Sequence, residues 1–353
     1  MLPYWFLFVI PAFGALNERT TYRGNATHKS FIGVILLLSV MIGLRFEVGG
    51  DWDAYLRYLD RSRYLSFFEV LTQGDPGYIL VNWLATRTVD TIWFVNLVCG
   101  LFFSVGLVAF AKAQPRPWLA LLVAIPYLVI VVAMGYSRQA VAIGFAMLGL
   151  VALTRDRSNI KFVIWVALAA TFHKTALLLV PIAALSAARG RVWTACWIGV
   201  STVLLYYLFL EDSVDRLIYG YIEREYNSQG AAIRVTMNAL PAIIFLLARR
   251  RFYLSYNERR LWTNIAFLAL AFIGFLIVSP SSTVVDRMAL YFIPLQIFVL
   301  SRLPDAFPEK ESNIGLIGVS VILYSAAIQF VWLNFAANSH AWLPYQFYPL
   351  LGE

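Results

Sequence analysis

The chain has 353 residues, of which 60% are hydrophobic and only 14% charged, with a mean hydropathy of +0.70. About a quarter of the residues of a soluble domain are charged, so this composition excludes an ordinary soluble enzyme and indicates a polytopic membrane protein. The longest polar intervals, near residues 45–76 and 211–234, are too short to bury a core of their own. We therefore expect one membrane-embedded domain over residues 1–353.

Apolar runs predict about ten full membrane spans. Two shorter runs, Lys161–Phe172 and Thr175–Ala188, flank His173 and Lys174, and neither crosses a core of about 30 Å, so we expect half-spans or a tight hairpin there. The predicted fold is an all-α transmembrane bundle with an external loop region at 45–76. The full spans are expected at 2–16, 31–46, 92–111, 118–134, 138–153, 192–210, 235–249, 261–279, 288–302 and 314–333.

Basic residues gather on one side of these spans. The intervals on that side hold 17 Lys and Arg against 6 acidic residues, whereas the other side holds 11 Lys and Arg against 14 acidic residues. The intervals of the basic side lie near 17–30, 112–117, 154–161, 189–191, 249–260 and 302–311. By the positive-inside rule the first side is cytoplasmic and both termini lie outside. The net charge of +8 then reflects topology, and we predict no nucleic-acid partner.

Five cations lie at the outer ends of predicted spans: Arg45, Arg138, Lys174, Arg234 and Arg287. Arg138 opens an apolar span, where a charge is expensive unless it snorkels or pairs, so it is either an interfacial anchor or an anion site. Ser137 before it suits an N-cap. Arg234 and the neighbouring Asp286 and Arg287 also admit a purely structural interpretation. Together the five cations predict a ring suited to a diphosphate at the membrane surface.

Three residues are candidates for acid–base chemistry. His173 interrupts an apolar run and is either a satisfied hydrogen-bonding residue or a general base. Asp53 precedes a predicted helix and suits an N-cap, whereas Asp51 is less easily explained that way and is the stronger candidate for hydroxyl activation. No second histidine lies at metal-ligand spacing, and two carboxylates alone are a weak cation signal, so we predict no metal site.

Aromatic residues lie close to these charges. Their rings suit stacking on sugars, although interfacial belts of membrane proteins use the same residue types. The candidates are Trp52, Tyr55, Tyr58, Tyr136 and Tyr291.

Six pieces, in chain order, resemble the EpsG-type family of Wzy-like polysaccharide polymerases: RFEVGGDWDAY, GDPGYILVNWL, YSRQAVAIGFAM, ATFHKTALLLVPI, DRMALYF and the terminal WLPYQFY. The extra glycine and doubled aspartate of VGGDWD depart from the pattern and leave the working carboxylate open. The positions that match the family's motifs are Arg45, Gly49 or Gly50, Asp51, Asp53, Tyr55, Gly77, Tyr78, Asn82, Ser137, Arg138, Gln139, Phe172, His173, Arg287 and Tyr291.

The resemblance implies a bacterial inner-membrane glycosyltransferase, related to the GT-C class, that joins oligosaccharide repeat units carried on undecaprenyl diphosphate. It implies a metal-independent and cofactor-free reaction at the periplasmic face, with the lipid-linked oligosaccharides, the bilayer and a chain-length regulator as partners. A catalytic carboxylate in the first long external loop, as in that class, matches Asp51 and Asp53.

The expected roles follow from that chemistry. The base is His173 or Asp51, with Asp53 third, and the diphosphate contacts are Arg138 and Arg287, supported by three further cations. Sugar contacts are expected from four rings. The supporting cations are Arg45, Arg234 and Lys174, and the rings are Trp52, Tyr55, Tyr136 and Tyr291.

Three alternatives stay open at this point. An O-antigen ligase uses the same donor and differs only in its acceptor. A lipid-linked oligosaccharide flippase or another transporter needs no base, but transporters usually show repeated halves, and the sequence shows no internal repeat. A membrane scaffold without activity is the third.

Overall fold

The computed structural model describes residues 1–18, 28–181, 230–279, 281–308 and 311–351, with residues 199, 200 and 203. Its first part contains α1 (Leu2–Leu16), α2 (His28–Gly43), β1 (Arg45–Phe46), α3 (Trp52–Ser62), α4 (Phe67–Leu71), α5 (Pro76–Thr86), α6 (Ile92–Lys112), α7 (Pro117–Ala124), the π-helix η1 (Ile125–Ala133), α8 (Ser137–Thr154), α9 (Asn159–Phe172) and the 3-10 helix η2 (Lys174–Leu179). Its second part contains α13 (Ala231–Ala248), α14 (Tyr256–Val278), α15 (Ser282–Ala289), the 3-10 turn η5 (Leu290–Phe292), α16 (Ile293–Ala306), α17 (Glu311–Phe335), η6 (Ser339–Ala341), β2 (Gln346–Phe347) and η7 (Tyr348–Leu350).

Six helices among the described residues are long and apolar enough to cross a membrane: Ile92–Lys112, Ser137–Thr154, Ala231–Ala248, Tyr256–Val278, Ser282–Ala306 and Ile314–Phe335. The chain is thus a polytopic helical membrane protein, as predicted. Nine of the ten expected full spans lie in this part of the chain, and three of them, at Leu2–Leu16, Lys29–Gly43 and Pro117–Ala133, are shorter apolar helices. The span predicted at 192–210 lies almost wholly outside the described residues.

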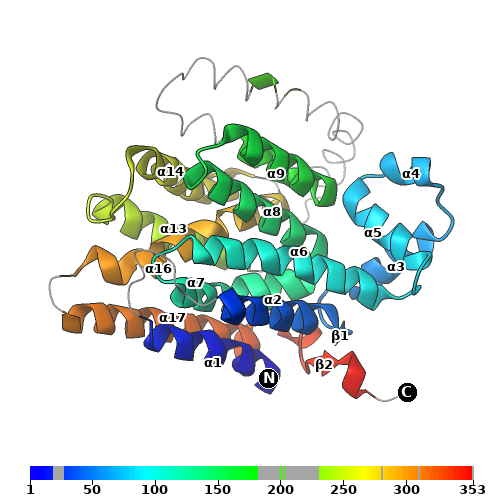
Figure 1. Cartoon of the computed structure of the whole chain (residues 1–353), viewed down its shortest axis with the longest axis horizontal. Helices are drawn as coiled ribbons and strands as arrows, with labels where there is room; N and C mark the ends of the chain where they lie inside the picture. Colours follow the sequence, from blue (N-terminus) through cyan, green and yellow to red (C-terminus); the bar gives the residue numbers. More distant parts are fainter. Residues whose placement is uncertain are drawn as a thin grey trace.

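The spanning helices lie side by side, and α3, α4 and α5 gather at one end of the bundle together with β1 and β2 (Figure 1). The external region expected at 45–76 contains the helix predicted after Asp53, which is α3, and one further short helix, α4. Its helices escaped prediction as spans because α5, with 11 residues, extends only about 16 Å. This end is called the outer end below.

Small residues let α6 and α8 approach closely, as in many membrane helix pairs. A Cβ added at Gly106 would clash with the backbone of Gly144, and one added at Gly144 would lie 2.9 Å from the Cα of Phe103. The crossing fixes α8 against α6 in the core. It thereby fixes Arg138, in the first turn of α8, at the outer end.

Charged residues at the opposite end, called the inner end, tie together the intervals that we predict to be cytoplasmic. Arg116 pairs with Asp305 at 2.8 Å, and the Arg302 guanidinium donates to the Gln114 side chain at 3.0 Å. Arg155 donates to the Ala113 carbonyl. The intervals near 112–117, 154–161 and 302–311 therefore share one end, as the charge pattern predicted, while the side of the membrane that this end faces stays a prediction.

The C-terminal segment holds the loop that carries Asp51. Antiparallel pairing joins Arg45 to Phe347, and the Gly49 amide donates to the Ala341 carbonyl at 2.8 Å. Gly49 has a φ of +107°, and a Cβ there would lie 2.6 Å from the Met134 carbonyl oxygen, so glycine is required at this position. The loop consequently lies directly against the chain that leads into α8.

Candidate active site

Arg138 is anchored at the outer end through one of its three guanidinium nitrogens. Nη1 donates to Asp75 Oδ2 at 2.7 Å and to the Tyr58 hydroxyl at 3.1 Å. The guanidinium also lies over the Tyr58 ring, 4.8 Å from its centroid. Nε and Nη2 make no hydrogen bond to the described residues, so the planar fork that recognises phosphate oxygens keeps donors available.

Asp75 joins three elements around that arginine. It is the N-cap residue of α5, and its carboxylate also accepts a hydrogen bond from the backbone N–H of Lys174. Burial raises the pKa of Asp75, although Arg138 opposes the shift. Gly77 makes this junction possible because a Cβ there would clash with Thr171 at the end of α9. The Gly-Tyr pair of the sequence pattern thus brings α5 against the chain around His173.

Asp51 presents a carboxylate that makes no hydrogen bond within the described chain. It occupies the N-cap position of α3, but its side chain caps no backbone amide. Burial raises the pKa of Asp51, and the nearby positive charges of Arg287 and Arg138 oppose that shift. A desolvated, unpartnered carboxylate facing two arginines has the properties of a general base.

Asp53 lies in a different environment. It belongs to the first turn of α3, after the N-cap, and its side chain is exposed. The expectation that Asp53 caps this helix is therefore wrong, because the helix begins one residue earlier, at Trp52. Asp51 is the less exposed of the two aspartates, and it lies in the electrostatic field of both arginines.

His173 ends α9 with extended backbone, at φ −155° and ψ 112°, and the 3-10 helix η2 follows it. Its Nδ1 lies 2.6 Å from the Thr175 hydroxyl, which donates to the Tyr291 hydroxyl at 3.3 Å. Burial lowers the pKa of His173 to about 3, and the charges of Arg138 and Arg287 act in the same direction. The imidazole is therefore neutral at pH 7. The predicted break between two helices at His173 is confirmed; the second run is described only as far as residue 181.

Arg287 and Arg234 reach the same end from α15 and α13. The Gln139 amide donates to the Arg287 carbonyl at 2.6 Å, while Arg234 forms a two-pronged ion pair with Asp286 at 2.7 and 2.6 Å. Tyr136, just before α8, lies within electrostatic range of four charged residues: Arg234, Asp51, Asp286 and Arg287. Both arginines, Asp51 and Tyr136 therefore belong to one cluster.

Arg45 is fully buried and directed into the protein. Its guanidinium donates to the carbonyls of Val48 and Ile42, to Ser137 Oγ at 2.8 Å and to Asn96 at 3.5 Å. All three nitrogens are engaged, so Arg45 joins β1 to α6 and α8 and presents no open donor. Ser137 accepts this bond and belongs to α8, so the expectation that it is the N-cap is wrong; Tyr136 holds that position.

The aromatic candidates divide by burial. Trp52, Tyr55 and Tyr291 are 8%, 2% and 4% exposed; Trp52 packs on Phe46 and Tyr55 on Tyr78. Rings enclosed in this way have no face open to a sugar. Tyr136 and Tyr58 are only partly buried.

Sequence reasoning missed Asp75 and Thr175 as parts of this cluster. Asp75 is 63 positions from Arg138, so no local spacing links the two residues. The available signal was the sequence Asp75-Pro76, since a helix N-cap followed by proline marks a helix start. Lys174, beside His173, contributes its backbone N–H to Asp75 and a positive charge to the same carboxylate.

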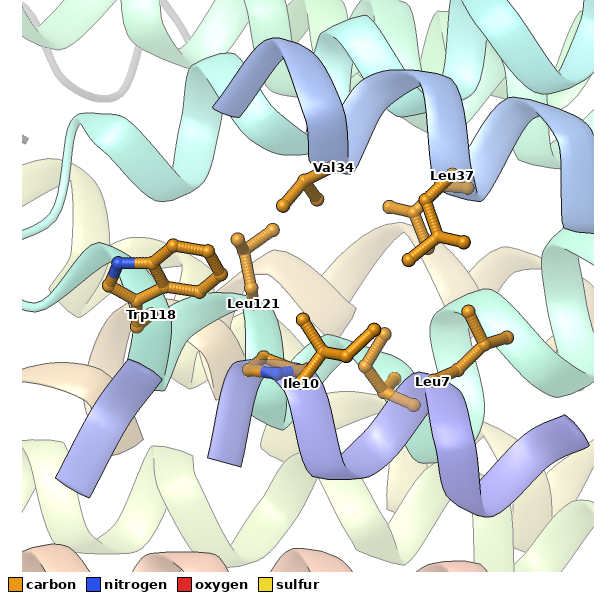
Figure 2. Close-up of a pocket in the computed structure, with 9 residues that line it drawn as sticks. Leu7, Ile10, Val34, Leu37, Trp118 and Leu121 are labelled. Carbon is orange, nitrogen blue, oxygen red and sulfur yellow. The ribbon is translucent and has the colours of Figure 1, made fainter. Parts of the chain in front are cut away.

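An apolar groove lies away from these charges, in the wall formed by α1, α2 and α7. Figure 2 shows Val34 and Leu37 facing Leu7 and Ile10 across it, with Trp118 at one end. Its lining is entirely apolar, so it offers space for hydrocarbon and no group for chemistry. Among the described residues, Arg138, Asp51 and His173 lie at the outer end, away from this groove.

Comparison with known proteins gives a match to a family model. No curated protein and no solved structure matches the chain. A family model matches residues 29–347, which include every residue of the cluster described above. The chain belongs to the EpsG family, whose members are membrane proteins linked to exopolysaccharide biosynthesis.

Proposed function

We propose that this protein is a polysaccharide polymerase that transfers a growing undecaprenyl-diphosphate-linked glycan onto an undecaprenyl-diphosphate-linked repeat unit at the outer face of the bacterial inner membrane. The main support is the environment of Asp51, a carboxylate without a hydrogen-bond partner among the described residues that lies in the field of Arg138 and Arg287. A base and two anion-binding groups are what glycosyl transfer from a diphosphate requires.

In the proposed reaction, a sugar hydroxyl of the incoming repeat unit attacks the anomeric carbon of the growing chain. The bond from that carbon to the diphosphate oxygen breaks, and undecaprenyl diphosphate leaves with the electron pair. Asp51 accepts the hydroxyl proton. Arg138, through its open Nε and Nη2 donors, and Arg287 neutralise the charge that develops on the leaving group, with Arg234 and Lys174 adding positive potential.

His173 takes a different role from the base in this scheme. A group with a pKa of about 3 is a weak proton acceptor at pH 7. If Nδ1–H donates to Thr175, the lone pair of Nε2 is left to accept a hydrogen bond from a sugar hydroxyl. His173 then orients the acceptor, Tyr136 contributes a sugar contact, and Asp53 takes no part.

The test is polymerisation by the purified protein in liposomes that contain undecaprenyl-diphosphate-linked repeat units, with the products resolved on a gel. A ladder of products supports the proposal, and Arg138→Ala should abolish it. Movement of the lipid-linked unit between leaflets without a ladder would contradict the proposal in favour of a flippase. Transfer only to an added lipid A-core acceptor would contradict it in favour of a ligase.

A further inference from the structure

Two side-chain amides hold the short break between α15 and α16. Gln139 Nε2, from α8, donates to the Arg287 carbonyl at 2.6 Å, and Asn238 Nδ2, from α13, donates to the Ala289 carbonyl at 2.9 Å. Gln296 Nε2, from α16, donates to Asn238 Oδ1 at 2.9 Å and fixes the orientation of that amide. The three amides are 2% to 5% exposed, so water does not replace them easily.

The backbone at this place departs from a regular α-helix. Leu290–Phe292 forms a 3-10 turn, and Pro294 follows at the start of α16. Proline has no N–H and therefore removes one i→i−4 hydrogen bond from the ladder. A local 3-10 turn has poorer hydrogen-bond geometry than the α-helix around it. The two amides donate to the carbonyls of Arg287 and Ala289, in the last turn of α15 directly before this break, and so tie it to α8 and α13.

The break carries two groups of the proposed site. Arg287 and Tyr291 are four residues apart, a spacing that places side chains on one face of a helix. Tyr291 accepts the hydrogen bond of Thr175 beside His173, and Arg287 acts on Asp51. A small rotation of this turn would move Arg287 relative to Asp51, and such misplacement weakens transition-state stabilisation.

We propose that Gln139 and Asn238, the latter oriented by Gln296, are positioning residues that hold the α15–α16 break so that Arg287 faces the reaction centre. None of the three needs to touch the substrate. This inference rests on the proposed function for its kinetic consequence, whereas the structural part of it can be measured without any reaction.

The test replaces each amide with an apolar side chain of similar volume: Gln139→Met and Asn238→Leu. The matched control is Gln329→Met, because Gln329 is an equally buried amide that donates to a backbone carbonyl, that of Tyr4 at 3.1 Å, between α17 and α1. Two quantities are compared in the full-length protein. One is hydrogen exchange of the backbone over residues 284–293, and the other is polymerisation rate at saturating lipid-linked unit.

Both site variants should show exchange over 284–293 at least ~10-fold faster than the control variant, the change given by losing one hydrogen bond of about 1.4 kcal/mol. The rate should fall ~10-fold or more while the KM for the lipid-linked unit stays within ~3-fold, since an interaction made chiefly in the transition state is weakened. Gln139→Asn, which keeps an amide on a shorter stem, should recover part of both.

Exchange equal to that of the control would overturn the proposal, as would faster exchange with an unchanged rate. If the wild-type protein forms no polymer, the proposed function fails while the exchange comparison still decides whether the amides hold the break. The two failures are therefore distinguishable.

Discussion

The two ends of the bundle use the same residue type in opposite ways. At the inner end, all three guanidinium nitrogens of Arg116 donate hydrogen bonds, to both Asp305 oxygens and to the Glu18 carbonyl. At the outer end, Arg138 donates to the described part of the protein through Nη1 alone. An ion pair that engages every donor is a structural bridge, whereas one that leaves donors available is suited to a further anion.

The carboxylates show the same contrast. Glu18 accepts the backbone N–H groups of Trp118 and Leu119 at the start of α7, so its oxygens stabilise a helix N terminus. Asp51 lies at a helix N terminus as well and caps nothing. The difference teaches that unsatisfied hydrogen-bonding capacity, rather than charge or position at a helix end, distinguishes the candidate site from the scaffold.

The largest effect that would sharpen this contrast is expected from Asp51→Asn. Loss of a general base lowers a rate by roughly 10²- to 10⁴-fold, and Asp53→Asn, two positions away, should stay within about threefold of the wild type. The measurement is the polymerisation rate in liposomes, normalised to folded protein. Equal loss in both variants would remove the distinction between the two aspartates.

Arg45→Lys tests the prediction that Arg45, whose three guanidinium nitrogens all donate hydrogen bonds within the protein, has a structural role. Lysine keeps the charge but cannot reach the four acceptors at once, and each buried acceptor left unsatisfied costs about 1–3 kcal/mol. We expect a clearly lower midpoint of thermal unfolding in detergent, with the rate per folded molecule nearly unchanged. A normal midpoint with lost polymerisation would instead place Arg45 in the diphosphate site.

The pH dependence distinguishes Asp51 from His173 as the base. Because burial raises the pKa of Asp51, the rate should fall with acidification at a pH above the ordinary range for a carboxyl group. His173, with a pKa of about 3, is already neutral at pH 6.5 and should cause no fall of the rate near that pH. His173→Gln should therefore lower the rate about tenfold without changing the pH at which the rate falls. A fall of the rate near pH 6.5 that is absent from this variant would make His173 the base.

The smallest effect is expected at the inner end, from Glu18→Gln. Burial raises the pKa of Glu18 to about 7, above its unfolded value of 4.5. The folded protein then binds the proton more tightly than the unfolded chain, so this carboxyl lowers stability as the pH rises from about 4.5 to 7. Glutamine removes the titration, and the midpoint of unfolding should depend less on pH over that interval. An unchanged pH dependence would contradict the assignment.

Several parts of this arrangement follow from the sequence alone. The span at 92–111 and the span at 138–153 are predicted within one or two residues because long apolar runs allow no other structure in a membrane. The shared end of Arg116 and Asp305 follows from counting basic residues. A helix was also predicted where α3 lies, whereas α4 and α5 were harder to predict, since both are short and the burial of α5 depends on packing against α6 and α9.

The distinction between Arg45 and Arg138 was not predictable from the sequence. Both arginines lie at a span end and both match the family pattern, so composition and spacing treat them alike. Their partners come from distant segments, Asn96 and Ser137 for one and Asp75 for the other. Only the fold shows which guanidinium keeps donors available.

The most direct test of the account is to make the same substitution at both ends, as Arg138→Lys and Arg116→Lys, and to measure polymerisation and thermal unfolding of each. Lysine at 138 keeps the ion pair with Asp75 but lacks the planar fork of the guanidinium, so we expect a rate roughly 10²- to 10³-fold lower with little change in stability. Lysine at 116 should lower the unfolding midpoint and leave the rate per folded molecule intact. Normal polymer from Arg138→Lys, or equal losses of rate in both variants, would contradict the claim that the outer end is the active site.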